Sequence, residues 1–331
     1  MKLVDRTVER VDEIQRGRPW ISFPIGVVKK YSDDKGSNLA ALISFYGFFS
    51  LFPLLIVFVT ILGFVLQGNE DLQKSILDSA LAQFPVIGDQ IKDNIGSVSG
   101  NGIMLAVALL LTLWAGLGGV KAVASAMDTV WDVPIKHRPN LLSSTVRAFI
   151  MLAVLGTGTL AATGLSAIAT GGGDFNPLKI LGIVGATLLN FGVFLLAFRI
   201  LTAAEVWWRE VLPGAVVAAI GWEALQLAGA YIVGHQIKNA SQTYGTLAFV
   251  IGLLVWLRIG AQLTLYAAEV NVVKARKLWP RALREPPGTK ADAVALRRFA
   301  HVEERVPGES VEVKFQEEET PHDSPAGRSP G

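Results

Sequence analysis

Two long apolar runs in the C-terminal half constrain this chain more than any other feature. They cover residues 212–234 and 246–273, a short polar turn joins them, and each has one charge near its middle, Glu223 and Arg258. About 20 apolar residues cross the hydrocarbon core of a bilayer, so each run is long enough to span a membrane. Because a charge at that depth costs roughly 2.5 to 3.5 kcal/mol on insertion scales, each of these residues requires a partner, water or a function.

Glu223 and Arg258 have matching positions in the two runs. The first lies eleven residues into its run and the second twelve, which at ~1.5 Å per residue predicts a similar mid-membrane depth in an antiparallel hairpin. Two interpretations stay open: a structural ion pair, or groups that line an intramembrane pathway or anchor a polar headgroup. The other residues of this predicted substrate pathway are Gln226 on the first run, and Gln262, Tyr266, Glu269 and Asn271 on the second.

The composition excludes an ordinary soluble domain. Of 331 residues, 51% are hydrophobic and 18% are charged, with a mean hydropathy of +0.43. We therefore predict an all-α integral membrane protein with six transmembrane helices and short amphipathic helices. A polar stretch of 38 residues precedes the first apolar run, too long for the n-region of a signal peptide, so we expect that run to remain as an anchor.

Apolar runs and polar connections divide the chain as follows. Residues 1–38 are predicted to form an amphipathic N-terminal segment, and residues 67–101 an outward loop with two short amphipathic helices. Small residues at 114–119 would let another helix approach closely. Residues 274–331 are predicted to form a basic collar that contacts anionic lipid, followed by a disordered tail. The expected spans are residues 39–66, 103–120, 148–170, 178–201, 212–234 and 246–273.

Lysine and arginine are distributed unequally between the two predicted sides of the membrane. Of these residues, 25 lie in the segments on the side that carries both termini and 4 lie on the opposite side. By the positive-inside rule, this predicts a multi-pass protein of the bacterial inner membrane with cytoplasmic N- and C-termini.

Signatures of catalysis are missing from the sequence. There is no phosphate-binding P-loop, no Gly-x-Ser-x-Gly and no cysteine, and the four histidines are scattered along the chain. We therefore predict no catalytic residue, no bound metal and no cofactor. The basic collar has no aromatic platform or RNA-binding motif beside it, so we expect no nucleic-acid partner.

Four stretches carry a resemblance to a known family. They contain Phe45-Tyr46 with Ser50-Leu-Phe-Pro-Leu54, Trp114 with Ala126-Met-Asp-Thr-Val-Trp-Asp-Val133, Leu212-Pro-Gly214 with Trp222-Glu223, and Tyr244-Gly245 with Val255-Trp-Leu257 and Ala268-Glu-Val-Asn271. In this order they resemble the YihY/BrkB family of bacterial inner-membrane proteins over roughly residues 25–275. The chain departs from the family pattern at Arg258, where an aromatic or apolar residue is usual.

The resemblance implies six spans, cytoplasmic termini and two functional associations. One is an old label as ribonuclease BN, and the other is a set of envelope phenotypes that suggest handling of lipids. Our leading hypothesis is a non-enzymatic protein that translocates or positions a lipid or other amphipathic envelope molecule through a polar-lined groove. The alternative is a membrane scaffold that binds envelope proteins. An RNA-processing enzyme is a third, disfavoured hypothesis. The expected partners are membrane lipids and envelope proteins.

Overall fold

The secondary structure that is described consists of helices. The computed structural model describes residues 12–15, 17–65, 102–170, 177–232, 238–283 and 288–315. The predicted all-α class is confirmed for these residues. Their helices are α2 (Pro19–Asp33), α3 (Gly36–Val65), α6 (Gly102–Val130), the 3-10 turn η1 (Ile135–His137), α7 (Leu141–Thr170), α8 (Pro177–Ile200), α9 (Trp208–Ile232), α10 (Lys238–Arg276) and α11 (Lys290–Val302).

Each of the six predicted spans overlaps one long helix, in chain order α3, α6, α7, α8, α9 and α10. Three stretches of the described residues are long and apolar enough to cross a membrane, and two further helices contain shorter apolar stretches. The predicted outward loop, residues 67–101, lies outside the described residues. The long stretches are Leu141–Gly158, Trp208–Gly229 and Val250–Arg276, and the shorter ones are Gly36–Leu51 and Val184–Ile200.

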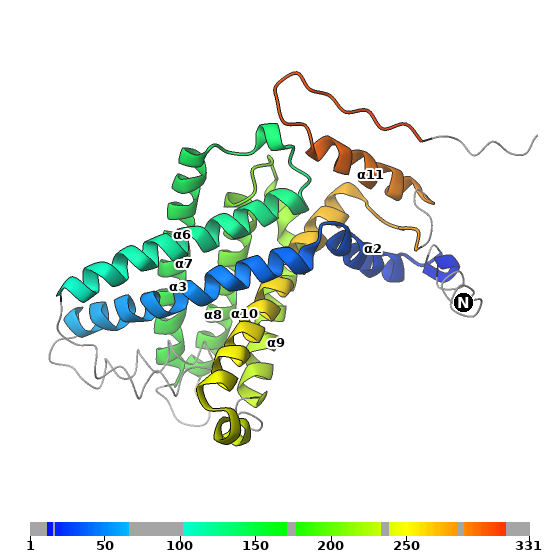
Figure 1. Cartoon of the computed structure of the whole chain (residues 1–331). Coiled ribbons are helices and arrows are strands. Elements are labelled where there is room, and N and C mark those ends of the chain that lie inside the picture. The colour runs from blue at the N-terminus through cyan, green and yellow to red at the C-terminus, as the bar shows by residue number, and fades with distance from the viewer. Residues whose placement is uncertain are drawn as a thin grey trace, which may run out of the picture.

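The six long helices form a closed ring of contacts. Around the ring, α3 packs on α6, α6 on α7, α7 on α8, α8 on α9, α9 on α10, and α10 on α3 again (Figure 1). The longest, α10, has 39 residues. At ~1.5 Å per residue it is about 58 Å long, well beyond a hydrocarbon core of about 30 Å, so part of it lies outside the bilayer.

Glycines allow two of these helix pairs to approach closely. A Cβ added at Gly118 of α6 would lie 2.8 Å from the Tyr46 ring of α3. A Cβ at Gly214 of α9 would lie 2.1 Å from the Ala267 carbonyl oxygen of α10. Small residues permit such contacts between apolar helices, which otherwise gain little from the hydrophobic effect in lipid. The predicted close approach at residues 114–119 is therefore made by α3.

The N-terminal segment packs against the end of α10. Helix α2 begins at Pro19, a position where the missing N–H costs nothing, and its buried face contacts α10. A sharp elbow then leads into α3, with Lys35 in the left-handed region at φ 54. A Cβ at Gly36 would lie 2.3 Å from the Tyr31 ring, so this elbow requires glycine.

The C-terminal region contains a helix that the sequence did not predict. Helix α11 begins with a capping box, in which the Thr289 side chain accepts a hydrogen bond from the Asp292 amide and the Asp292 side chain accepts one from the Thr289 amide. The prediction of a disordered tail is therefore wrong for residues 288–315. The segment is polar and charged, and this composition led to the prediction of disorder. The Asp292 carboxylate of the capping box is nevertheless fully buried. Residues 316–331 lie outside the described residues.

Candidate functional site

Glu223 and Arg258 lie at similar levels but contact different helices. Gly214 packs on Asn271 and Gly221 on Leu263, a register that puts Glu223 about one helical turn from the level of Arg258. The Glu223 carboxylate accepts a hydrogen bond from Asn190 of α8, at 3.1 Å. Arg258 instead donates to Ser37 Oγ of α3, at 2.8 Å. This register agrees with the expectation of similar levels, and the ion pair, one of the two interpretations left open above, is not formed between these two side chains.

The remaining predicted residues lie on α9 and α10, and three of those on α10, Gln262, Tyr266 and Glu269, lie near Tyr31 of α2. On α9, Gln226 is half-buried one turn beyond Glu223, and Gln262 is half-buried on α10. Tyr266 stacks on Tyr31 of α2, with ring centroids 4.0 Å apart. Asn271 is fully buried and accepts a hydrogen bond from the Gly214 amide at 2.6 Å, which joins two of the motifs quoted above. Glu269, also fully buried, faces a group of charges from other elements.

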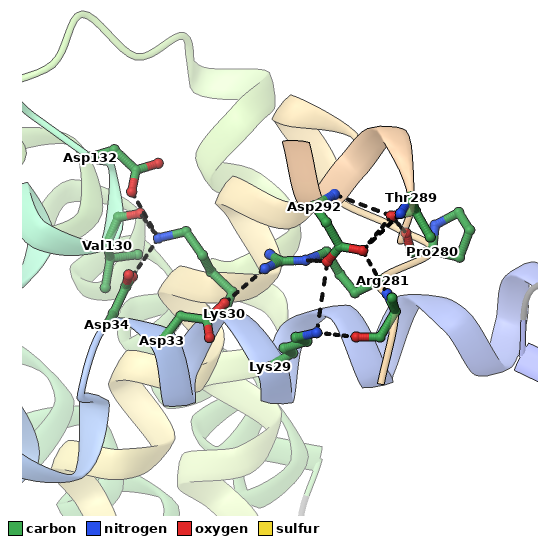
Figure 2. Close-up of polar contacts among 11 residues, drawn as sticks. Lys29, Lys30, Asp33, Asp34, Val130, Asp132, Pro280, Arg281, Thr289 and Asp292 are labelled. Atoms are coloured by element: carbon green, nitrogen blue, oxygen red, sulfur yellow. Dashed lines mark hydrogen bonds and ion pairs between the residues drawn. The ribbon is translucent and has the colours of Figure 1, made fainter. Parts of the chain in front are cut away.

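We name this group the Lys30 cluster: Lys30, Asp34, Asp132, Glu269 and Arg276. The Lys30 ammonium is fully buried and forms ion pairs with Asp34 and, at 3.1 Å, with Asp132 (Figure 2). It also donates to the Val130 carbonyl oxygen at 3.1 Å. Arg276 binds the other Asp132 oxygen at 2.7 Å. The cluster thus ties α2 to the ends of α6 and α10.

The charges of the Lys30 cluster do not balance when every group is ionised. Two cations face three carboxylates. Asp34 Oδ1 and both Glu269 oxygens accept no hydrogen bond from an N–H or O–H group of the described residues. The Asp34 and Glu269 side chains are within hydrogen-bonding reach of each other. One proton shared between them would satisfy an oxygen on each and bring the net charge to zero.

Protonation within the Lys30 cluster follows from burial and from neighbouring charges. Burial raises the pKa of Asp34 to about 6, against the opposing effect of Lys30. Burial also acts to lower the pKa of Lys30, but the carboxylates of Glu269, Asp132 and Asp34 outweigh it, so the Lys30 pKa lies above its usual value. The ammonium therefore stays charged, and the proton that is gained or lost near neutral pH belongs to the carboxyl groups.

A second buried group locks α2 to the C-terminal region. Arg281, only 2% exposed, binds Asp292 at 2.7 Å and Asp33 at 2.8 Å (Figure 2). Lys29 approaches the same Asp292 carboxylate at 3.7 Å and donates to the Ala282 carbonyl oxygen. The pKa of Asp292 is lowered despite burial, because the Ala282 amide, Arg281 and Thr289 all donate to it. Arg281 was predicted to contact lipid, and that prediction is wrong because its guanidinium is used inside the protein.

Sequence reasoning missed four of the five members of the Lys30 cluster. It assigned Glu269 to the pathway, but placed Lys30 in the amphipathic N-terminal segment and Arg276 in the basic collar. Two signals pointed the other way: the i,i+4 spacing of Lys30 and Asp34, and the position of Asp132 inside the quoted stretch 126–133. The first signal reveals only the local Lys30–Asp34 pair, because the contacts between α2, α6 and α10 join residues about 100 to 240 positions apart in the sequence.

Apolar helices in a closed ring, with charges gathered at one end, define a multi-pass membrane protein. The chain matches the family model described as "Virulence factor BrkB" over residues 27–291. It therefore belongs to the BrkB family. The matched region includes the whole Lys30 cluster and Arg281.

Several curated relatives match most of the chain. The inner membrane protein YhjD of Escherichia coli is 22% identical over 290 residues, which cover 81% of this chain and 84% of YhjD. YfkH of Bacillus subtilis, whose name describes it as ribonuclease-like, is 25% identical over 78% of this chain and 98% of its own length. A UPF0761 membrane protein of Alkalilimnicola ehrlichii is 26% identical over 88% of this chain and 68% of its own. No solved structure matches.

Proposed function

We propose that this protein translocates or positions a lipid or another amphipathic envelope molecule along a polar path on its helical bundle. The proposal involves no covalent change of that molecule. It rests on polar side chains set into otherwise apolar helices, and above all on the surroundings of Arg258.

Arg258 is exposed on the face of α10 that is otherwise apolar. Its neighbours Val255 and Ile259 on the same helix are 50% and 43% exposed, as expected for side chains that face lipid. The guanidinium donates to Ser37 Oγ, a neutral acceptor, and no carboxylate among the described residues forms an ion pair with it. An exposed cation on an apolar helix is costly in a membrane unless an anionic or polar group meets it. A lipid headgroup that passes or docks at this point supplies such a group.

The proposed orientation places both termini in the cytoplasm and the bundle in a bacterial inner membrane. The N-terminal α2 and the segment before α11 touch each other through Asp33 and Arg281, so the two ends of the described chain lie on one side. That side carries the excess of Lys and Arg, which the positive-inside rule assigns to the cytoplasm. The relative YhjD is named an inner membrane protein.

Leaflet exchange in proteoliposomes tests the proposal. The purified full chain is reconstituted, and exchange of labelled anionic, zwitterionic and glycosylated lipids is compared with empty vesicles. We expect accelerated exchange of at least one lipid, and loss of most of that acceleration in Arg258→Leu. Ile259→Leu is the matched control, because it changes the adjacent exposed position without altering charge. Exchange no faster than in empty vesicles for every lipid would reject translocation and favour the scaffold hypothesis.

A further inference from the structure

A cavity of about 730 Å³ lies beside the Lys30 cluster. It is formed where the end of α6, the connection between α8 and α9, the end of α10 and helix α11 meet. Trp131, Val133 and the pair Ala203 and Ala204 give it apolar walls, whereas most of its charged lining is basic. Its polar lining consists of Arg276, Arg297, Arg298, His137, His301, Asp132 and Glu205.

The two acidic side chains do not neutralise this lining. Asp132 is already bound by Lys30 at 3.1 Å and by Arg276 at 2.7 Å, so it adds no free negative charge to the cavity. Glu205 is exposed to solvent. Three guanidinium groups, of Arg276, Arg297 and Arg298, thus face two carboxylates, of Asp132 and Glu205, which leaves the lining with a net positive charge.

Arg297 and Arg298 form no ion pair within the part of the chain that the structure describes. Arg297 faces the Phe315 ring with its guanidinium 5.6 Å from the ring centroid, a contact that leaves its N–H donors available. Arg298 is half-buried on the next position of α11. Like charges that converge on a concave space repel each other, and an anion that enters the space removes this repulsion.

We propose that this cavity binds a phosphate-bearing anion, held by Arg297 and Arg298 at the end of the bundle. Guanidinium groups match the tetrahedral oxygens of phosphate through paired N–H donors, which is why arginine is favoured at such sites. The apolar walls beside Trp131 offer room for an ester or glycerol group next to the phosphate. The ligand is the headgroup of an anionic lipid or a soluble phosphate ester. This site is separate from Arg258 and does not require the proposed translocation.

Calorimetric titration of the purified full chain in mild detergent tests the site. Dihexanoyl phosphatidic acid represents a lipid headgroup, inorganic phosphate represents the soluble source, and dihexanoyl phosphatidylcholine controls for partition into detergent. We expect the double variant Arg297→Gln/Arg298→Gln to weaken binding of the phosphate probe about tenfold or more, as for loss of charge-assisted hydrogen bonds. Tighter binding of phosphatidic acid than of inorganic phosphate would assign the lipid source, and comparable binding the soluble one.

The matched control is Arg305→Gln/Lys314→Gln. It removes the same charge from exposed positions close to α11 that do not line the cavity. We expect its affinity to stay within about twofold of that of the parent chain, since distant exposed charges are screened. The single variant Arg298→Ala provides a second measurement if the double variant loses its fold. The proposal is overturned if neither phosphate probe binds, if phosphatidylcholine binds as tightly as phosphatidic acid, or if the two double variants lose affinity equally. Leaflet exchange can fail or succeed independently of these results.

Discussion

Charged residues within the bundle and charged residues at its end have different surroundings. Among the described residues, Glu223 and Arg258 each make one side-chain hydrogen bond, to Asn190 and to Ser37, and each bond joins two helices. At the end of the bundle, Lys30 alone contacts the Asp34 carboxylate at the end of α2, and the Val130 carbonyl oxygen and Asp132 carboxylate at the end of α6. Glu223 and Arg258 interrupt apolar helices, whereas the Lys30 cluster joins α2, α6 and α10 beside their apolar contacts.

This difference separates two uses of charge in a membrane protein. A network in which most groups are paired fixes the positions of its helices, because removing any member leaves another buried and unpaired. A single polar contact on an apolar face contributes less to folding and stays available to a ligand. We therefore expect substitutions in the Lys30 cluster to act on stability, and substitutions of Arg258 to act on function.

The largest expected effect is that of Lys30→Met. The substitution keeps an unbranched side chain but leaves the carboxylates of Asp34, Asp132 and Glu269 with only Arg276 as counter-ion. Breaking a buried pair by removing one partner typically costs ~3 to 5 kcal/mol. We expect a loss of this size in the free energy of unfolding, measured with denaturant in mild detergent. Lys314→Met, at an exposed position, is the control and should lie close to the parent chain.

The pH dependence of stability tests the excess negative charge of the same cluster. The pKa of Asp34 rises from 3.8 to about 6 on folding, so the folded state holds this proton more tightly than the unfolded chain does. The resulting stability is fully present below about pH 4 and is lost as the pH rises through 6. A shift of this size corresponds to at most ~3 kcal/mol. Asp34→Asn removes this titration and leaves two cations facing two carboxylates.

We expect the parent chain to lose stability relative to Asp34→Asn between pH 4 and pH 7. The measurement is the unfolding midpoint across that range. Glu312→Gln, at an exposed position, is the control for the loss of one carboxylate that lies outside the cluster. Parallel pH profiles for the parent chain and Asp34→Asn would show that Asp34 stays ionised, and would contradict the shared proton.

Packing between the spanning helices should matter more than their internal charges, and Gly214→Ala tests this. The added Cβ would lie 2.1 Å from the Ala267 carbonyl oxygen and 2.4 Å from Asn271 Nδ2. Overpacking of this kind usually costs about 1 to 3 kcal/mol. Gly192→Ala on α8 is a matched control, since nothing lies within 4 Å of its added Cβ. Thermal unfolding that is equal for the two variants would show that α9 and α10 can separate without penalty.

The apolar runs predicted the helices well, because an α-helix pairs the backbone N–H and C=O groups of a run within the run itself. The runs at 103–120 and 246–273 gave helices at the expected places, which extend to Val130, as the helical pattern indicates, and to Arg276. The same reasoning failed for Arg281 and for α11, where a polar composition indicated solvent or lipid. Burial of those charges depends on Asp33 and Asp292, and no periodicity within one segment reveals a partner on another.

The smallest expected effect concerns Glu223 and Arg258 themselves. A double-mutant cycle with Glu223→Gln, Arg258→Leu and their combination measures the free energy that couples the two side chains. Because Glu223 contacts Asn190 and Arg258 contacts Ser37, the two side chains have different hydrogen-bond partners among the described residues. Independent sites usually add within ~0.3 to 0.5 kcal/mol, so we expect a coupling no larger than this. A coupling of 1 kcal/mol or more, by the same additivity rule, would mean that the two charges interact in the membrane despite their separate hydrogen bonds. Arg258 would then belong with the Lys30 cluster as a structural charge, and its predicted loss of leaflet exchange would have to be ascribed to a changed fold.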